Sequence, residues 1–133
     1  MINERLNENL LREYSPVVLA YIGDAVFELM VRTHMVCAGN NKIHNLHLST
    51  VELVQAKSQA CIVRYIFPLL TEKEQDIVKR GRNAKGTVPK NADPAEYSLS
   101  TGFEALLGYL YLQGNEERLN GLVKKILQHA EGN

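Results

Sequence analysis

Two acidic residues lie in unusually apolar surroundings and are the first candidates for chemistry. Asp24 lies in AYIGDAVFEL and Glu104 in TGFEALLGYLYL, where most neighbouring residues are apolar. A carboxylate is rarely buried unless it is paired or binds a cation, because removing its charge from water costs several kcal/mol. Glu28 follows Asp24 by four residues and therefore shares its face of a helix. If the two apolar segments pack side by side, all three acids converge.

Such a cluster of carboxylates would suit Mg²⁺, which takes oxygen ligands and keeps several waters. A site of this kind activates water and stabilises the leaving oxygen in phosphodiester hydrolysis. The alternative is structural: Asp24 caps a neighbouring element or pairs with Arg32 or Lys57, and Glu104 is held in a similar way. The spacing of the acids alone does not decide between these interpretations.

Two glycines indicate how the acids come together. Gly23 directly precedes Asp24, and Gly108 follows Glu104 by four residues. A glycine within a helix costs about 1 kcal/mol relative to alanine, and it usually marks the close approach of another backbone. We therefore expect the two apolar helices to cross closely at these positions.

Other catalytic patterns are missing from the sequence. The four histidines form neither an HExxH motif nor an adjacent His-Asp pair, and no GxxxxGK[ST] loop occurs. Cys37 and Cys61 lack the spacing of zinc ligands. Each lies in an apolar segment, so we expect reduced thiols in the core of a cytoplasmic protein rather than a disulfide.

Composition places the chain among soluble globular proteins. It has 133 residues, 15 Lys plus Arg against 15 Asp plus Glu, 45% apolar residues and 23% charged residues. These values exclude a disordered or collagen-like chain. No apolar run approaches the ~20 residues of a membrane span, and the start MINERLNENLL is neither a secretory signal nor a transit peptide. A single cytoplasmic domain without membrane association is predicted.

Caps and apolar periodicity predict about six helices and no strand, and thus one compact all-α domain. Ser15 followed by Pro16 starts a helix that ends near Gly39, and Thr71 with Glu74 forms a capping box. The helix after Ser15 is apolar on nearly all sides, so it is predicted to be the central one. The expected helices cover approximately residues 2–10, 16–38, 49–68, 72–82, 96–113 and 116–129, with connectors at 40–48 and 83–94.

One segment is strongly basic although the whole chain is neutral. No acidic residue occurs from 77 to 92, which contains Lys79, Arg80, Arg82, Lys85 and Lys90. The segment is either a basic patch for a polyanion or a solvated face with a flexible loop.

Four segments, in this order, resemble the ribonuclease III family: YIGDAVFEL (21–29), VELVQAKSQA (51–60), KRGRNAKGTVPKN (79–91) and FEALLGYLYL (103–112). The chain is most similar to the bacterial Mini class, which consists of the catalytic domain alone. The resemblance covers nearly the whole chain. It implies a single ribonuclease III-type endonuclease domain over residues 1–133, without a separate double-stranded-RNA-binding domain.

The resemblance also implies a function. Members cleave double-stranded RNA with Mg²⁺ as homodimers, and the Mini class matures the ends of 23S ribosomal RNA precursors, where ribosomal proteins are candidate partners. By position, Asp24 matches the essential aspartate and Glu104 the essential metal-binding glutamate. Glu28 fits either an outer-sphere base at the metal or a surface ion pair. Without a separate RNA-binding domain, the catalytic domain itself must bind RNA, and the expected RNA-binding residues are Lys79, Arg80, Arg82, Lys85 and Lys90.

The chain departs from longer members at three acidic positions, where it has Val17, Ala20 and Thr101. We therefore expect fewer metal ligands and more coordinated waters. A catalytically weak or inactive RNA-binding domain of the same fold, acting in ribosome biogenesis, remains the alternative. A helical nucleotide pyrophosphohydrolase would need paired Glu-x-x-Glu elements, which the chain lacks outside the start of its final helix. For the dimer, the apolar helix with Val18, Tyr21 and Ile22 is the expected interface.

Overall fold

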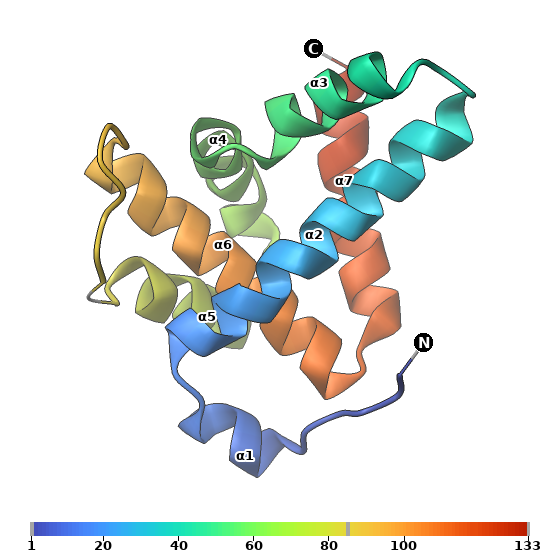
Figure 1. Ribbon diagram of the computed structural model, residues 1–133. Helices are drawn as coiled ribbons and strands as arrows, with labels where there is room; N and C mark the ends of the chain where they lie inside the picture. The colour runs from blue at the N-terminus through green and yellow to red at the C-terminus, as the bar shows by residue number, and fades with distance from the viewer. Residues whose placement is uncertain (1, 85, 133) are drawn as a thin grey trace.

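Seven α-helices and one short 3₁₀ turn, with no strand, form the regular structure of the described residues (Figure 1). The structure is a computed structural model, and it describes residues 2–84 and 86–132. The elements are, in chain order, α1 (Glu8–Glu13), α2 (Pro16–Ala38), α3 (Ile43–Val54), α4 (Ala56–Ile66), the 3₁₀ turn η1 (Phe67–Leu69), α5 (Glu72–Arg82), α6 (Pro94–Gln113) and α7 (Glu116–Glu131). The predicted all-α fold class is confirmed. None of these helices is long and apolar enough to cross a bilayer.

Helix α6 is the centre of the fold, since α1, α2, α4, α5 and α7 all pack against it. Figure 1 shows α2 crossing α6, with α5 on one side of the crossing and α7 on the other. The prediction that the helix after Ser15 is central was wrong. Helix α2 buries Phe27 and Val31 completely on one side, but Tyr21 on another side is 82% exposed. Helix α2 therefore has more apolar side chains than the core of one chain buries.

Residues 40–68 also differ from the prediction. Helix α3 begins at Ile43, so most of the expected connector is helical. The expected single helix that follows is broken at Gln55, where ψ is 154°. Gln55 ends α3 by donating its backbone N–H to Val51, and it starts α4 by accepting from the backbone N–H of Gln59. One extended residue thus serves as the cap of both helices, and this keeps the chain hydrogen-bonded through a sharp change of direction.

The N-terminal helix is shorter than expected. The side chain of Asn7 accepts a hydrogen bond from the backbone N–H of Leu10 at 3.0 Å and starts α1 at Glu8. Leu6 lies outside α1 and donates its N–H to the carbonyl oxygen of Leu112 at 2.8 Å. This tertiary hydrogen bond takes the residues before Asn7 out of the helix that their apolar spacing predicts.

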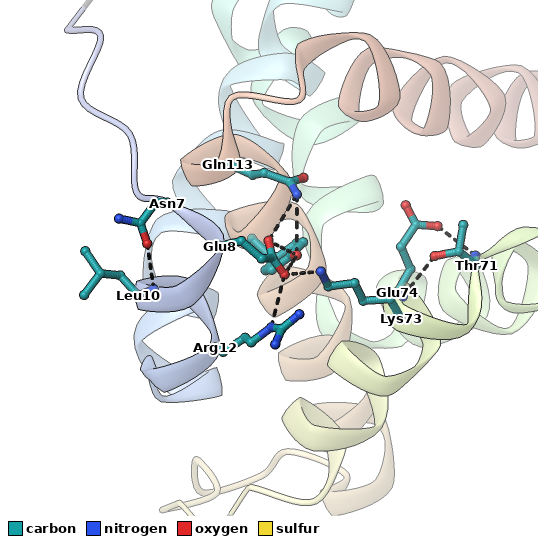
Figure 2. Close-up of polar contacts among 9 residues, drawn as sticks. Asn7, Glu8, Leu10, Arg12, Thr71, Lys73, Glu74 and Gln113 are labelled. Carbon is teal, nitrogen blue, oxygen red and sulfur yellow. Dashed lines mark hydrogen bonds and ion pairs between the residues drawn. The ribbon is translucent and has the colours of Figure 1, made fainter.

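A polar cluster around Glu8 joins α1 to α5 and α6 (Figure 2). The carboxylate of Glu8 accepts a hydrogen bond from the hydroxyl of Tyr109 at 2.6 Å and forms ion pairs with Lys73 and Arg12. Tyr109 is only 4% exposed, so its ring is part of the core and its hydroxyl reaches the edge. The cluster holds the short α1 against the rest of the fold.

Local caps set three helix boundaries, and those at Ser15 and Thr71 agree with the prediction. The hydroxyl of Ser15 accepts from the backbone N–H of Val17 at the start of α2. Thr71 and Glu74 form both hydrogen bonds of the capping box that opens α5. Gly114 ends α6 in the left-handed conformation, with φ of 80°, which costs glycine little.

Both cysteines are free, but neither is a core thiol as predicted. Cys37 and Cys61 are exposed. Cys37 lies in the last turn of α2, one residue before its end at Ala38, and Cys61 lies on the outer face of α4. An apolar segment with a helical period still has a face toward solvent, and both thiols lie on that face.

The ion pair between Glu74 and Arg118 ties α5 to the first turn of α7 and makes stability depend on pH. Glu74 is only 6% exposed, and the guanidinium donates to both of its carboxylate oxygens, at 2.7 and 2.9 Å. Burial acts to raise the pKa of Glu74, but the hydrogen bonds from Arg118 and Thr71 outweigh burial and lower the pKa below 4.5. The stabilisation is therefore complete above pH 4.5, and it is lost as the pH falls through the lowered native pKa.

Replacing Arg118 by methionine is expected to lower the free energy of unfolding at pH 7 by about 2–3 kcal/mol, because a buried carboxylate loses its partner. Urea unfolding from pH 7 to pH 3 should show this difference shrinking as Glu74 becomes protonated. Arg12→Met is the matched control. It removes an exposed ion pair to Glu8 and should cost less than about 1 kcal/mol. A deficit in Arg118→Met that is independent of pH would contradict this account.

Candidate active site

Helices α2 and α6 cross with their backbones in direct contact at two glycines. A Cβ atom on Gly23 would lie 1.7 Å from the carbonyl oxygen of Glu104, and one on Gly108 would lie 1.9 Å from that of Leu19. No side chain fits at such distances. The predicted close crossing at these two glycines is thus confirmed, and it brings the residues that flank the glycines together.

The crossing places the carboxyl groups of Asp24 and Glu104 within hydrogen-bonding reach of each other. Glu104 is half-buried, whereas Asp24 is exposed. The apolar sequence neighbours of Asp24 do not bury it, because they lie on other faces of α2. The pair forms a site with one carboxylate held near the core and one that faces solvent.

The environment of Glu104 strongly disfavours its charged form. Burial, followed by the hydrogen bond and the negative charge of Asp24, raises the pKa of Glu104 from 4.5 to about 8. A hydrogen bond from Gln59 acts in the opposite direction. Two carboxylates in direct contact avoid charge repulsion by sharing a proton or by binding a cation.

Gln59 is a residue of this site that the prediction missed. It is 1% exposed, and its amide nitrogen donates to Oε2 of Glu104 at 3.3 Å and to the carbonyl oxygen of Val54 at 2.9 Å. The segment VELVQAKSQA, quoted above for its resemblance, contains Gln59. No feature of the sequence singles out Gln59, because its contact with Glu104 depends on how α4 packs on α6.

The donor set suits Mg²⁺ better than zinc. In the described part of the chain, no group of three or more His, Cys, Asp or Glu residues is arranged to hold a metal ion. A cation at Asp24 and Glu104 would therefore have two protein carboxylates and fill its other positions with water or substrate oxygens. That pattern is typical of Mg²⁺.

Comparison with known proteins agrees with this geometry. The Ribonuclease III domain family matches residues 17–115. The chain is 53% identical over 117 residues to the Mini-ribonuclease 3 of Symbiobacterium thermophilum, covering 87% of this chain and 90% of the relative. It is 48% identical over 129 residues to that of a Thermoanaerobacter species, covering 96% and 91%. The chain belongs to the ribonuclease III family. The predicted family and the predicted endoribonuclease class are thereby confirmed.

A solved structure supports the fold of this ribonuclease III-family chain. The crystal structure of a protein from Fusobacterium nucleatum matches it with a TM-score of 0.80 and 34% identity, covering 90% of this chain and 96% of that one. The match extends over nearly all of both chains. The arrangement of helices around the α2–α6 crossing is therefore that of a known all-α fold.

Glu28 lies one turn from Asp24 and forms an ion pair with Arg32, with 3.2 Å between Oε2 and Nη2. Arg32 was also an alternative partner for Asp24, and here it pairs with Glu28. The pair lies on the surface, as the structural alternative for Glu28 predicted. Its role as an outer-sphere base stays a prediction.

The positions where longer ribonuclease III members have further acids contribute no carboxylate here. Val17 is exposed at the start of α2, and Ala20 is buried in the core. Thr101 donates its hydroxyl to the carbonyl oxygen of Tyr97 within α6. The described acidic pair of this ribonuclease III domain is thus Asp24 and Glu104.

The basic residues are positioned by a second contact between backbones. A Cβ on Gly81 of α5 would lie 2.6 Å from Cα of Gly102, and one on Gly102 would lie 2.4 Å from the carbonyl oxygen of Val78. This contact holds the C-terminal end of α5 against α6, two residues before Glu104. Four basic side chains are exposed there or in the following loop, namely Lys79, Arg80, Arg82 and Lys90; Lys85 lies outside the described residues.

Proposed function

We propose that the chain is a Mg²⁺-dependent endoribonuclease that cleaves double-stranded RNA and matures the ends of 23S ribosomal RNA precursors in the cytoplasm. The observation that carries the proposal is the contact between Asp24 and Glu104 in a chain of the ribonuclease III family. When bound, Mg²⁺ would supply the charge that lowers the pKa of a coordinated water and neutralises the phosphate.

The two carboxylates have different positions in the proposed metal site. Glu104, half-buried and hydrogen-bonded by Gln59, would hold the cation against α6. Asp24 is exposed, so it would hold the cation on the side that an RNA phosphate can approach from solvent. The backbone contact between Gly23 and Glu104 keeps the two carboxylates close together.

The proposal is tested by incubating a double-stranded RNA, and in parallel a folded 23S precursor end, with the protein in the presence and absence of Mg²⁺. Cuts on both strands that require Mg²⁺ are expected. Binding without any cleavage would favour the alternative of a catalytically inactive RNA-binding domain, which the missing acids at positions 17, 20 and 101 would explain. Adding ribosomal proteins to the precursor tests whether they present it.

We also propose that the basic residues from Lys79 to Lys90 grip the RNA backbone. Double-stranded RNA is contacted through its phosphates and 2′-hydroxyls rather than by base reading. Replacing Arg80 and Arg82 with glutamine is expected to weaken binding and to reduce the slope of log K against log salt by about one for each lost phosphate contact. Filter binding across a salt series measures both quantities.

The control for this experiment is the pair Lys124→Gln and Lys125→Gln, which removes the same charge from the exposed face of α7. Binding in this control should change little. Equal slopes in the wild type and in the Arg80 and Arg82 variant would remove these residues from the RNA interface. Lys79, Lys85 and Lys90 can then be tested in the same way.

We propose that the chain acts as a homodimer. Two strands of a duplex are related by a local two-fold axis, and two active centres related by a two-fold axis match them. The exposed apolar side of α2, with Val18, Tyr21 and Leu29, supports a self-complementary interface. Tyr21→Asp is expected to convert a dimer to a monomer in sedimentation at micromolar concentration, because a buried unpaired charge opposes association. A wild-type monomer would contradict the proposal.

A further inference from the structure

We propose that Gln59 is a positioning residue that orients Glu104 for metal binding. The inference rests on the proposed function, because it assigns a role at the same site. Gln59 would act through Glu104 and would not itself contact the RNA.

The orientation of the Gln59 amide is determined by its two partners. Oε2 of Glu104 and the carbonyl oxygen of Val54 both accept hydrogen bonds, so the amide nitrogen must face them. The amide oxygen, Oε1, is then left buried without a hydrogen-bond partner among the described atoms. Reversing the amide would place this oxygen against two acceptors, which is worse.

The unpartnered oxygen shows that the amide is not there for packing. A buried acceptor without a partner destabilises a protein, and an unbranched apolar side chain such as methionine would fill a similar volume without that penalty. What glutamine provides and methionine cannot is a donor to Glu104.

The junction between α3 and α4 has other hydrogen bonds that do not reach the site. The hydroxyl of Ser58 donates to the carbonyl oxygen of Glu52, and the amide of Gln55 contacts both Glu52 and Ser58. Gln59 joins the same junction to α6, across 45 residues of sequence. The hydrogen bond to Glu104 is thus separable from those that shape the junction.

A neutral donor suits a metal ligand for an electrostatic reason. An arginine or lysine at this place would hold Glu104 but would also cancel the charge that attracts a cation. The amide of Gln59 restrains Oε2 and leaves the negative charge available to the cation. Groups that orient metal ligands in this way typically change metal affinity or activity by about 10–100-fold when removed.

The experiment compares the wild type, Gln59→Met and the control Ser58→Ala. Mn²⁺ binding to the RNA-free protein is measured by calorimetry, and single-turnover cleavage is measured against Mg²⁺ concentration. In Gln59→Met we expect about 10–100-fold weaker Mn²⁺ binding and a matching rise in the Mg²⁺ concentration for half-maximal cleavage. The melting temperature and RNA affinity without metal should remain close to those of the wild type. Ser58→Ala should behave as the wild type.

The outcomes separate the two proposals. If the wild type neither binds Mn²⁺ nor cleaves, the proposed function fails. If the wild type does both and Gln59→Met matches it, or if Ser58→Ala shows the same loss, the role of Gln59 is overturned. Should Gln59→Met not fold, the side-chain amide signals of Gln59 in the wild-type NMR spectrum give the answer. They should shift when Mg²⁺ is added, and unchanged signals beside shifting Asp24 signals would overturn the inference.

Discussion

Asp24→Asn and Glu104→Gln are each expected to reduce Mg²⁺-dependent cleavage by about 10³-fold or more, because each variant removes one of two carboxylates from the proposed metal site. That factor corresponds to about 4 kcal/mol of transition-state stabilisation, within what a metal ion supplies. Cleavage of a labelled double-stranded RNA under single-turnover conditions measures the loss.

Three controls distinguish loss of the metal site from loss of RNA binding or of folding. RNA binding should survive in both variants, since the proposed grip lies in the basic segment. Without metal, both variants should remain folded, because burial and the neighbouring Asp24 already disfavour the charged form of Glu104, and a neutral amide at either position adds no buried charge. Glu28→Gln disrupts the surface ion pair with Arg32 and leaves the acidic pair intact. A loss in Glu28→Gln as large as that in Asp24→Asn would mean that the site is misassigned.

Gly23→Ala is expected to lower the free energy of unfolding by at least about 3 kcal/mol. Alanine favours a helix by about 1 kcal/mol over glycine, but its Cβ would overlap the Glu104 carbonyl oxygen at 1.7 Å. The contact is between two backbones, so α2 and α6 must separate, and overpacking of a core typically costs about 1–3 kcal/mol or more. Any molecules that remain folded should also lose activity, because the shift separates Asp24 from Glu104.

Gly121→Ala is the matched control for Gly23→Ala. Gly121 lies within α7, and a Cβ there would meet nothing within 4 Å. The substitution should therefore stabilise the protein by about 0.5–1 kcal/mol. Thermal or urea unfolding of both variants measures the contrast. A Gly23→Ala protein as stable as the wild type would show that the two helices do not cross in contact.

Local features and the glycine pair were predictable from the sequence. The caps at Ser15 and at Thr71 with Glu74 agree with the structure, because a cap depends on residues within one turn. The crossing at Gly23 and Gly108 was also predictable, since a glycine inside an apolar helix has few uses other than close contact. This reasoning placed Asp24 beside Glu104 without any coordinates.

Apart from this crossing, features that depend on how distant elements meet were not predictable. The apolar pattern of residues 49–68 predicts one helix. The structure has a break at Gln55, because α3 and α4 pack against different parts of the fold. Apolar character alone did not separate the exposed side of α2 from its buried side: Val18 and Tyr21, both expected at an interface, are exposed, whereas Ile22 is half-buried.

The residues alone predict an all-α chain that resembles ribonuclease III and has two glycines where its apolar helices cross. The exposure of Asp24, the partial burial of Glu104 and the hydrogen bond from Gln59 to Glu104 became known from the folded structure. Burial and side-chain contact depend on how helices are rotated against one another, and sequence spacing does not specify that rotation. The contact between Gln59 and Glu104 spans 45 residues, and it exists only once α4 and α6 have packed.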